Sequence, residues 1–141
     1  ELLISMSCPQ ILGRKIREKF TGGAINVHGA PLPRYRGLMP AFWILAAGEP
    51  KSAVTVHVLA DKLDNGEIIL QADVPLRPGD SWYDLVVRSK SIGADLLLDA
   101  VARIEAGTAE YRPNPDAEAT YFSFPTAADA RRFRAAGRRF F

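Results

Sequence analysis

The sequence contains a single cysteine, no long apolar run and little net charge. Cys8 alone can form neither an internal disulfide nor a cysteine-rich metal site, so we assign no metal ligands. No apolar run approaches the roughly 20 residues that span a bilayer, and no basic and apolar leader is evident, so we expect a cytoplasmic protein without a membrane partner. The formal net charge of +2 does not demand a nucleic-acid partner, although five arginines lie between Arg131 and Arg139.

The composition is that of an ordinary globular chain. Apolar residues make up 48% of it and charged residues 24%, which is enough for one modest hydrophobic core. The chain opens inside the apolar run "ELLISM" without an initiator methionine. Because a domain seldom starts within its own core, we expect that an N-terminal portion of the natural protein precedes residue 1.

Hydrophobic periodicity predicts alternating strands and helices. The predicted strands are 2–6, 24–28, 53–60 and 67–76, and the predicted helices are 9–20, 39–48, 79–107 and 124–137. The turn "DKLDNG", with its asparagine-glycine pair, joins the last two strands as an antiparallel hairpin. The order of the earlier elements favours parallel pairing. We therefore expect an α/β fold with a Rossmann-like, open, mostly parallel sheet and an antiparallel edge hairpin.

Three polar side chains end or follow predicted strands. Asn26 and His28 alternate along the strand 24–28 and therefore face the same side of the sheet. Asp64 lies in the loop after the strand 53–60. Because ligands of open α/β sheets bind beyond the carboxyl ends of the strands, we expect these three side chains to converge in one crevice.

The chemistry of this trio suits acyl transfer. A carboxylate at Asp64 favours the imidazolium form of His28, so we expect the pKa of His28 to lie above its ordinary value. A charged histidine and the side-chain amide of Asn26 can both donate to a developing oxyanion. Asp64 can accept a proton through water. No serine or cysteine stands in a recognisable nucleophile motif, so direct transfer to an amine fits better than a covalent acyl-enzyme.

Each of these residues also has a structural interpretation. Asn26 can satisfy a turn at a strand end, His28 can be a hydrogen-bonded structural histidine, and Asp64 can be the turn residue of "LDNG". We interpret His57 as a packed or supporting side chain, because it alternates with valines along its strand, and leave it out of the catalytic set.

Arginines in two places are open to more than one interpretation. Arg34 and Arg36 could grip a phosphate or a carboxylate, or could be solvated charges on an exposed loop. The C-terminal arginines could bind RNA or an anionic acceptor, or could form the solvent-exposed face of a short helix. In the second case we expect the neighbouring Phe133, Phe140 and Phe141 to pack or to form a subunit contact.

Two segments resemble motifs of the folate-dependent formyltransferases, the family of glycinamide ribonucleotide, methionyl-tRNA and sugar-amine formyltransferases. "INVHGAPLPRYRG" at 25–37 is similar to the Asn-x-His strand and Leu-Pro-x-x-x-Gly loop of that family. "VTVHVLADKLDNGEIILQADVPL" at 54–76 is similar to its second motif, which has a Leu-Asp-x-Gly core. The order and separation of the two segments also match. The resemblance implies that Asn26, His28 and Asp64 are catalytic.

The resemblance also implies a formyl donor and the residues that bind it. In that family 10-formyltetrahydrofolate supplies a formyl group to an amine. "SCPQIL" resembles the segment whose backbone holds the pterin ring, and the turn before Asp64 is a second candidate. The cofactor-binding candidates are Gln10, Ile11, Leu12, Ala60, Asp61, Lys62 and Leu63.

The resemblance extends over residues 1–110 as the C-terminal half of the family's catalytic domain, with 111–141 as an extension that carries a short basic helix. It implies that the N-terminal part of the domain is missing, and the sheet edge so exposed predicts self-association. The acceptor stays open between an aminoacyl-tRNA, a sugar nucleotide and a small amine. Alternative functions are hydrolysis of 10-formyltetrahydrofolate and a non-catalytic folate-binding or assembly fragment.

Overall fold

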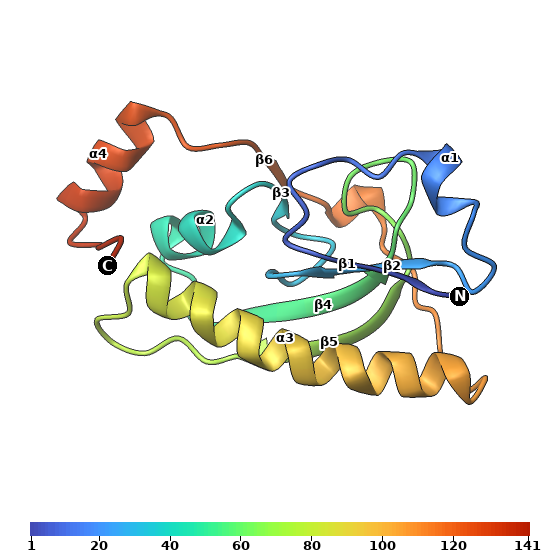
Figure 1. Ribbon diagram of the computed structural model, residues 1–141. Helices are drawn as coiled ribbons and strands as arrows, with labels where there is room; N and C mark the ends of the chain where they lie inside the picture. The colour runs from blue at the N-terminus through green and yellow to red at the C-terminus, as the bar shows by residue number, and fades with distance from the viewer.

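Four strands form the main sheet in the order β1-β2-β4-β5 (Figure 1). The computed structural model describes all residues from 1 to 141. The strands are β1 (Leu3–Met6), β2 (Ala24–His28), β4 (Ser52–Val58) and β5 (Ile68–Val74). β1 and β2 run parallel, whereas β2 pairs antiparallel with β4 and β4 antiparallel with β5. The α/β class and the edge hairpin are confirmed, but the expected parallel pairing of 24–28 with 53–60 is wrong.

The helices differ in how they meet this sheet. α3 (Trp82–Glu105) runs along one face of it, while α1 (Arg14–Arg17) and α4 (Ala127–Ala135) lie at opposite ends of the molecule (Figure 1). α2 (Pro40–Ala47) connects β3 (Arg36–Gly37) to β4. No helix has both the length and the apolar character needed to cross a membrane.

The start of α3 follows from its first residues. Ser81 accepts a hydrogen bond from the Asp84 N–H, and the Asp84 carboxylate accepts one from the Ser81 N–H, which completes a capping box. Further along, Gly93 permits close contact with the sheet, because a Cβ there would lie 3.0 Å from Val27 and 3.1 Å from Val54 side-chain carbons. The long helix therefore lies directly on the strands that carry the candidate site.

The predicted helix 9–20 is largely wrong. Only α1 is helical, and Gly13 before it has an extended backbone with no capping side chain. The apolar side chains whose spacing indicated a helix do not all face a core, since Ile11 is 80% exposed. Residues 9–12 instead form an irregular loop, which lies beside the pocket described below.

One hydrophobic core serves the whole chain. It joins Val54 and Val56 of the sheet to Leu85 of α3 and Phe42 of α2. Phe133 of α4 belongs to the same cluster, is 2% exposed, and stacks on Phe42 with ring centroids 4.5 Å apart. Burying a side chain of this size contributes roughly 1.5–3 kcal/mol. The expected packing of Phe133 is thus confirmed, while the domain boundary near residue 110 stays a prediction.

A second, small sheet ties the C-terminal segment to the loop after β2. β3 pairs in parallel with β6 (Tyr121–Phe122), so that Arg36 lies opposite Tyr121. The short 3-10 helix η1 (Asp116–Glu118) precedes β6. This arrangement brings residues 114–122 next to the motif loop although about 80 residues separate the two segments.

Candidate active site

A pocket of about 390 Å³ lies where β1 and β2 end. Its walls include Asn26, His28 and Asp64, and also all seven residues predicted to bind a cofactor, namely Gln10, Ile11, Leu12, Ala60, Asp61, Lys62 and Leu63. The volume lies within the range of about 300–1,000 Å³ that small-molecule sites occupy. The structure therefore brings all the residues predicted to be catalytic or to bind the cofactor to one cavity.

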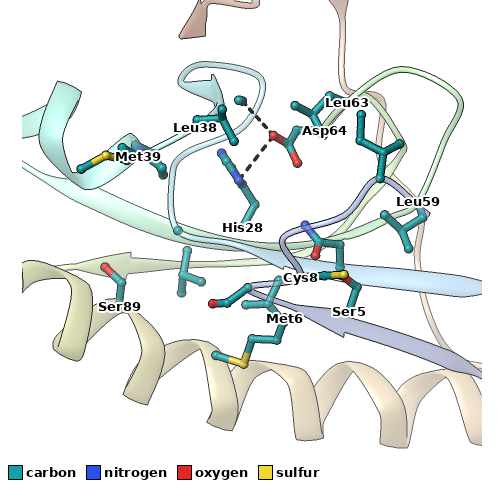
Figure 2. Close-up of a pocket in the computed structure, with 18 of the residues that line it drawn as sticks. Ser5, Met6, Cys8, His28, Leu38, Met39, Leu59, Leu63, Asp64 and Ser89 are labelled. Atoms are coloured by element: carbon teal, nitrogen blue, oxygen red, sulfur yellow. Dashed lines mark hydrogen bonds and ion pairs between the residues drawn. The ribbon is translucent and has the colours of Figure 1, made fainter. Parts of the chain in front are cut away.

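The three predicted catalytic residues converge by a route that differs from the expected one. β4 runs antiparallel to β2, so its end lies beside the start of β2, and the loop after it folds back over the sheet. Asp64 then reaches His28, with its Oδ2 3.5 Å from His28 Nδ1 (Figure 2). The same Oδ2 accepts a 2.8 Å hydrogen bond from the Gly37 N–H. Both the histidine and the aspartate are 7% exposed.

The second ring nitrogen of His28 fixes its tautomer. Nε2 lies 2.8 Å from the Tyr35 carbonyl oxygen, which can only accept, so Nε2 carries the ring proton. Nδ1 is then the unprotonated nitrogen, and it faces Asp64 and the pocket. Neutral His28 in this geometry is a proton acceptor rather than a donor.

The expectation that the pKa of His28 is raised is wrong. Burial disfavours the imidazolium and lowers the pKa of His28 below its ordinary value of 6.5. The Asp64 carboxylate and the Tyr35 carbonyl act in the opposite direction but do not compensate for burial, and His57 adds to the lowering. The sequence could show the neighbouring carboxylate but not how deeply the ring is buried.

Asp64 is held ionised by its surroundings. Burial alone would raise the pKa of its carboxyl group, but His57, His28 and the Gly37 N–H together keep that pKa below 3.8. Its backbone has a φ of 50°, in the left-handed region that is unfavourable for residues other than glycine. A buried carboxylate in such a conformation needs support from outside its own loop.

His57 belongs to the site although the sequence analysis left it out of the catalytic set. It is 1% exposed and lies directly opposite Asn26 in the antiparallel ladder. Its Nδ1 donates to the Val58 carbonyl at 2.8 Å, so its Nε2 can accept from Asn26 Nδ2 at 3.2 Å. The same Nε2 lies 3.6 Å from Asp64 Oδ1. These contacts are consistent with the interpretation of His57 as a supporting side chain. Knowledge of the antiparallel register of β2 and β4 would have revealed that His57 lies opposite Asn26.

We propose a role in the chemistry for Asn26, His28, His57 and Asp64 and call them the reaction centre. Residues 10–12 and 59–63 are called the rim. The two halves of the rim are joined by Arg17, which donates to the carbonyl oxygens of Leu12 at 3.1 Å and Leu59 at 2.8 Å. Its guanidinium also pairs with the Asp61 carboxylate. Figure 2 shows Leu59 and Leu63 on the loop side of the pocket, with Asp64 between Leu63 and His28.

The arginines of the motif loop do not line the pocket. Arg34 pairs with Glu49 and is half exposed. Arg36 is 6% exposed and donates to Asn114 and Asp116. Arg36 is therefore neither placed to bind a phosphate in the pocket nor a solvated charge on an exposed loop. No three His, Cys, Asp or Glu side chains gather in a group that could hold a metal ion.

The family model "Formyl transferase" matches residues 1–101. This chain belongs to the formyl transferase family. It is 38% identical over 121 residues to a methionyl-tRNA formyltransferase of Syntrophus aciditrophicus (strain SB), which covers 86% of the chain and 39% of the relative. The corresponding enzyme of Koribacter versatilis (strain Ellin345) is 41% identical over 98 residues, or 70% of the chain and 31% of the relative. The chain thus spans less than half the length of these curated relatives.

Solved structures of the formyl transferase family share the fold. The formyltransferase PseJ from Anoxybacillus kamchatkensis, solved in complex with UDP-4,6-dideoxy-4-formamido-L-AltNAc and tetrahydrofolate, superposes with a TM-score of 0.79 at 27% identity. That match covers 95% of this chain and 68% of PseJ. An N-formyltransferase from Helicobacter canadensis, in complex with folinic acid and dTDP-3-aminofucose, gives 0.76 at 28% identity, covering 85% and 44%. The family resemblance and the Rossmann-like fold class are confirmed.

Proposed function

We propose that the chain carries the reaction centre of an enzyme that transfers a formyl group from 10-formyltetrahydrofolate to an amine. The observation that carries this proposal is the meeting of the buried His28 and Asp64 with the half-buried Asn26 in the wall of a pocket of small-molecule size. The folates bound to the structural relatives, tetrahydrofolate and folinic acid, support the choice of donor.

The residues of the rim suit a folate. Ile11, Leu12, Leu59 and Leu63 offer apolar contacts at the mouth of the pocket, and the loop backbone between them offers polar groups. 10-Formyltetrahydrofolate carries its formyl group on N10. The acceptor amine attacks the formyl carbon, which forms the new C–N bond, and the bond between that carbon and N10 then breaks. We propose that Gln10, Ile11, Leu12 and the turn from Ala60 to Leu63 hold the donor.

Asn26 and His28 have different roles in the proposed reaction. One Nδ2 hydrogen of Asn26 goes to His57, which leaves the other free to donate to the formyl oxygen as negative charge develops there. Nδ1 of His28 accepts the proton that the attacking amine loses, directly or through water. Asp64 stabilises the resulting imidazolium from 3.5 Å. His28 then returns this proton to the departing nitrogen, so that no net proton is gained or lost.

We propose methionyl-tRNA as the acceptor. Relatives described as methionyl-tRNA formyltransferases share 32–41% of residues with the chain, whereas the two formyltransferase structures solved with sugar nucleotides share 27–28%. An amino sugar attached to a nucleotide is the competing acceptor. A cytoplasmic location and self-association stay predictions, and sedimentation at tens of micromolar, a working range for weak association, tests the second.

The test supplies purified protein with 10-formyltetrahydrofolate and, in separate reactions, methionyl-tRNA or a dTDP-linked amino sugar. Formylated acceptor is measured by mass spectrometry, and His28→Gln is the matched control. Formylation of methionyl-tRNA by the wild type alone is the expected result. Formate release without an acceptor would favour the hydrolase alternative. Binding of folinic acid without any turnover would favour the non-catalytic alternative and overturn the enzymatic proposal.

A further inference from the structure

Asn114 lies beneath the loop of the reaction centre although it is 50 residues away from Asp64 in the sequence. Its side chain is 9% exposed. Asn114 Nδ2 donates to the carbonyl oxygens of Asp64 at 3.0 Å and Gly66 at 2.9 Å. Both hydrogens of the amide are therefore used on the loop that carries the carboxylate.

Arg36 connects Asn114 to the other side of Asp64. Its Nη2 donates to the side-chain oxygen of Asn114 at 2.8 Å and to the main-chain oxygen of Asn114 at 2.9 Å. The next residue along the chain, Gly37, donates its N–H to Asp64 Oδ2. Asn114 is therefore connected to Asp64 in two ways. It holds the Asp64 backbone directly by a hydrogen bond, and it is linked to the Asp64 carboxylate through Arg36 and Gly37.

The loop requires such support because its conformation is unfavourable. Asp64 adopts a φ of 50°, a left-handed conformation that is unfavourable for a residue with a side chain unless the surrounding structure holds it. The loop is also pressed against β4, since a Cβ on Gly66 would lie 1.9 Å from the Val58 carbonyl oxygen. Without Asn114, two carbonyl oxygens of this tight loop would lose their hydrogen-bond donor, which would destabilise the loop in this position.

We propose that Asn114 is a positioning residue that sets the separation of the Asp64 carboxylate from His28 Nδ1. Only its consequence for turnover rests on the proposed formyl transfer, because the geometry itself can be measured without any substrate. The family match ends at residue 101, so Asn114 lies outside the segment that carries the two motifs. The titratable groups that face Asp64 are His28 on β2 and His57 on β4.

The test compares Asn114→Ala, which removes the side-chain amide, with Glu118→Gln, a control at an exposed position of the same segment. NMR titrations follow the Asp64 carboxyl carbon and the His28 ring in the protein without substrate. If Asp64 moves away from His28, its pKa is expected to rise and that of His28 to fall further. Turnover is expected to decrease by at least ~10-fold with the KM for the formyl donor within about twofold, because a displacement near 1 Å can cost ~100-fold.

Asn114→Gln provides the conservative comparison, because it keeps the amide on a longer side chain. Partial recovery of both titrations in this variant, relative to Asn114→Ala, would support the proposal. A folded Asn114→Ala protein with the wild-type titrations of Asp64 and His28 would overturn it. Loss of the fold in both variants would also overturn it, by showing a structural role only. If the wild type itself transfers no formyl group, the proposed function fails while the titrations still decide the role of Asn114.

Discussion

The reaction centre and the rim line the same pocket but are built in different ways. In the reaction centre, His28, His57 and Asp64 are at most 7% exposed, and each is fixed by a main-chain group. In the rim, Ile11 is 80% exposed, and one side chain, that of Arg17, joins the two halves. These three side chains of the proposed reaction centre are thus fixed by hydrogen bonds to the main chain, while the rim that we propose to hold the donor is more exposed.

This difference matches what each part has to do. Donors and acceptors at a reacting carbonyl contribute to the rate only if they are already oriented when charge develops. A binding rim can change side-chain rotamers on contact with a ligand at little cost to the reaction. Substitutions in the reaction centre should therefore affect kcat, whereas substitutions in the rim should affect KM. Two of the four experiments below test this division, and the other two test the contacts that hold the reaction centre.

The largest effect is expected from His28→Ala. The change removes the only unprotonated ring nitrogen that faces both Asp64 and the pocket, so the proton of the attacking amine loses its acceptor. We expect kcat to fall by on the order of 100-fold or more, within the range known for general bases. Steady-state kinetics of formyl transfer provide the measurement. Near-normal kcat in a folded variant would rule out His28 as the base.

Gly66→Ala should be the next most damaging change. The new Cβ would meet the Val58 carbonyl oxygen at 1.9 Å, so the loop must move away from β4 and Asp64 must move with it. Overpacking of this kind costs roughly 1–3 kcal/mol of unfolding free energy. Urea denaturation measures the loss, and Gly13→Ala, where a Cβ meets nothing within 4 Å, is the matched control. Equal stability of the two variants would contradict the described contact.

Arg17→Gln should weaken the rim and spare the reaction centre. The variant loses the hydrogen bonds to Leu12 and Leu59 and the ion pair with Asp61. Each such hydrogen bond contributes about 1 kcal/mol, so the KM for the formyl donor should rise by roughly 5–10-fold while kcat stays within about twofold. Arg14→Gln, on the exposed side of the same helix, serves as the control. A larger change in kcat than in KM would remove the distinction between the two regions.

The smallest effect concerns proton binding. The pKa of His28 lies below 6.5 through burial, and the Asp64 carboxylate opposes that shift, so Asp64→Asn should lower the pKa of His28 further. Because the folded-state pKa lies below the unfolded one, the stabilisation by neutral His28 is present above pH 6.5 and is lost as the pH falls through the folded value. NMR titration of the ring in both proteins measures the shift, and identical midpoints would show that the two side chains are uncoupled.

Local patterns in the sequence predicted much of this arrangement. The alternation of valines along β4 depends on neighbouring residues only, and the two motifs already placed Asn26, His28 and Asp64 together. The antiparallel pairing of β2 with β4 was missed, because strand direction depends on how the chain crosses the sheet and not on local periodicity.

Contacts between distant residues could not be predicted. Arg36 and Asn114 are 78 residues apart, and neither the loop motif nor the connector after α3 indicates that they meet. Burial of His28 was equally hidden, since nearby residues reveal its charged neighbour but not the surrounding protein that excludes water. The helix predicted at 9–20 was too long for a different reason. Its apolar side chains have the spacing of an amphipathic helix, but part of the segment is a loop in which Ile11 is 80% exposed.

The main-chain anchors of the reaction centre affect which mutations the site tolerates. The Tyr35 carbonyl, the Gly37 N–H and the Val58 carbonyl hold His28, Asp64 and His57, respectively. Apart from proline, every amino acid supplies the same N–H, and every amino acid supplies the same carbonyl, so a substitution at these three positions cannot delete the anchor unless it shifts the backbone. The side chain at position 58 can therefore change while the proton position on His57 persists. Tyr35 is more restricted, because it is 4% exposed and has a φ of 59°. Position 37 is the most restricted of the three, because its φ of 98° and the Phe122 carbonyl oxygen 2.1 Å from a Cβ leave room for glycine alone.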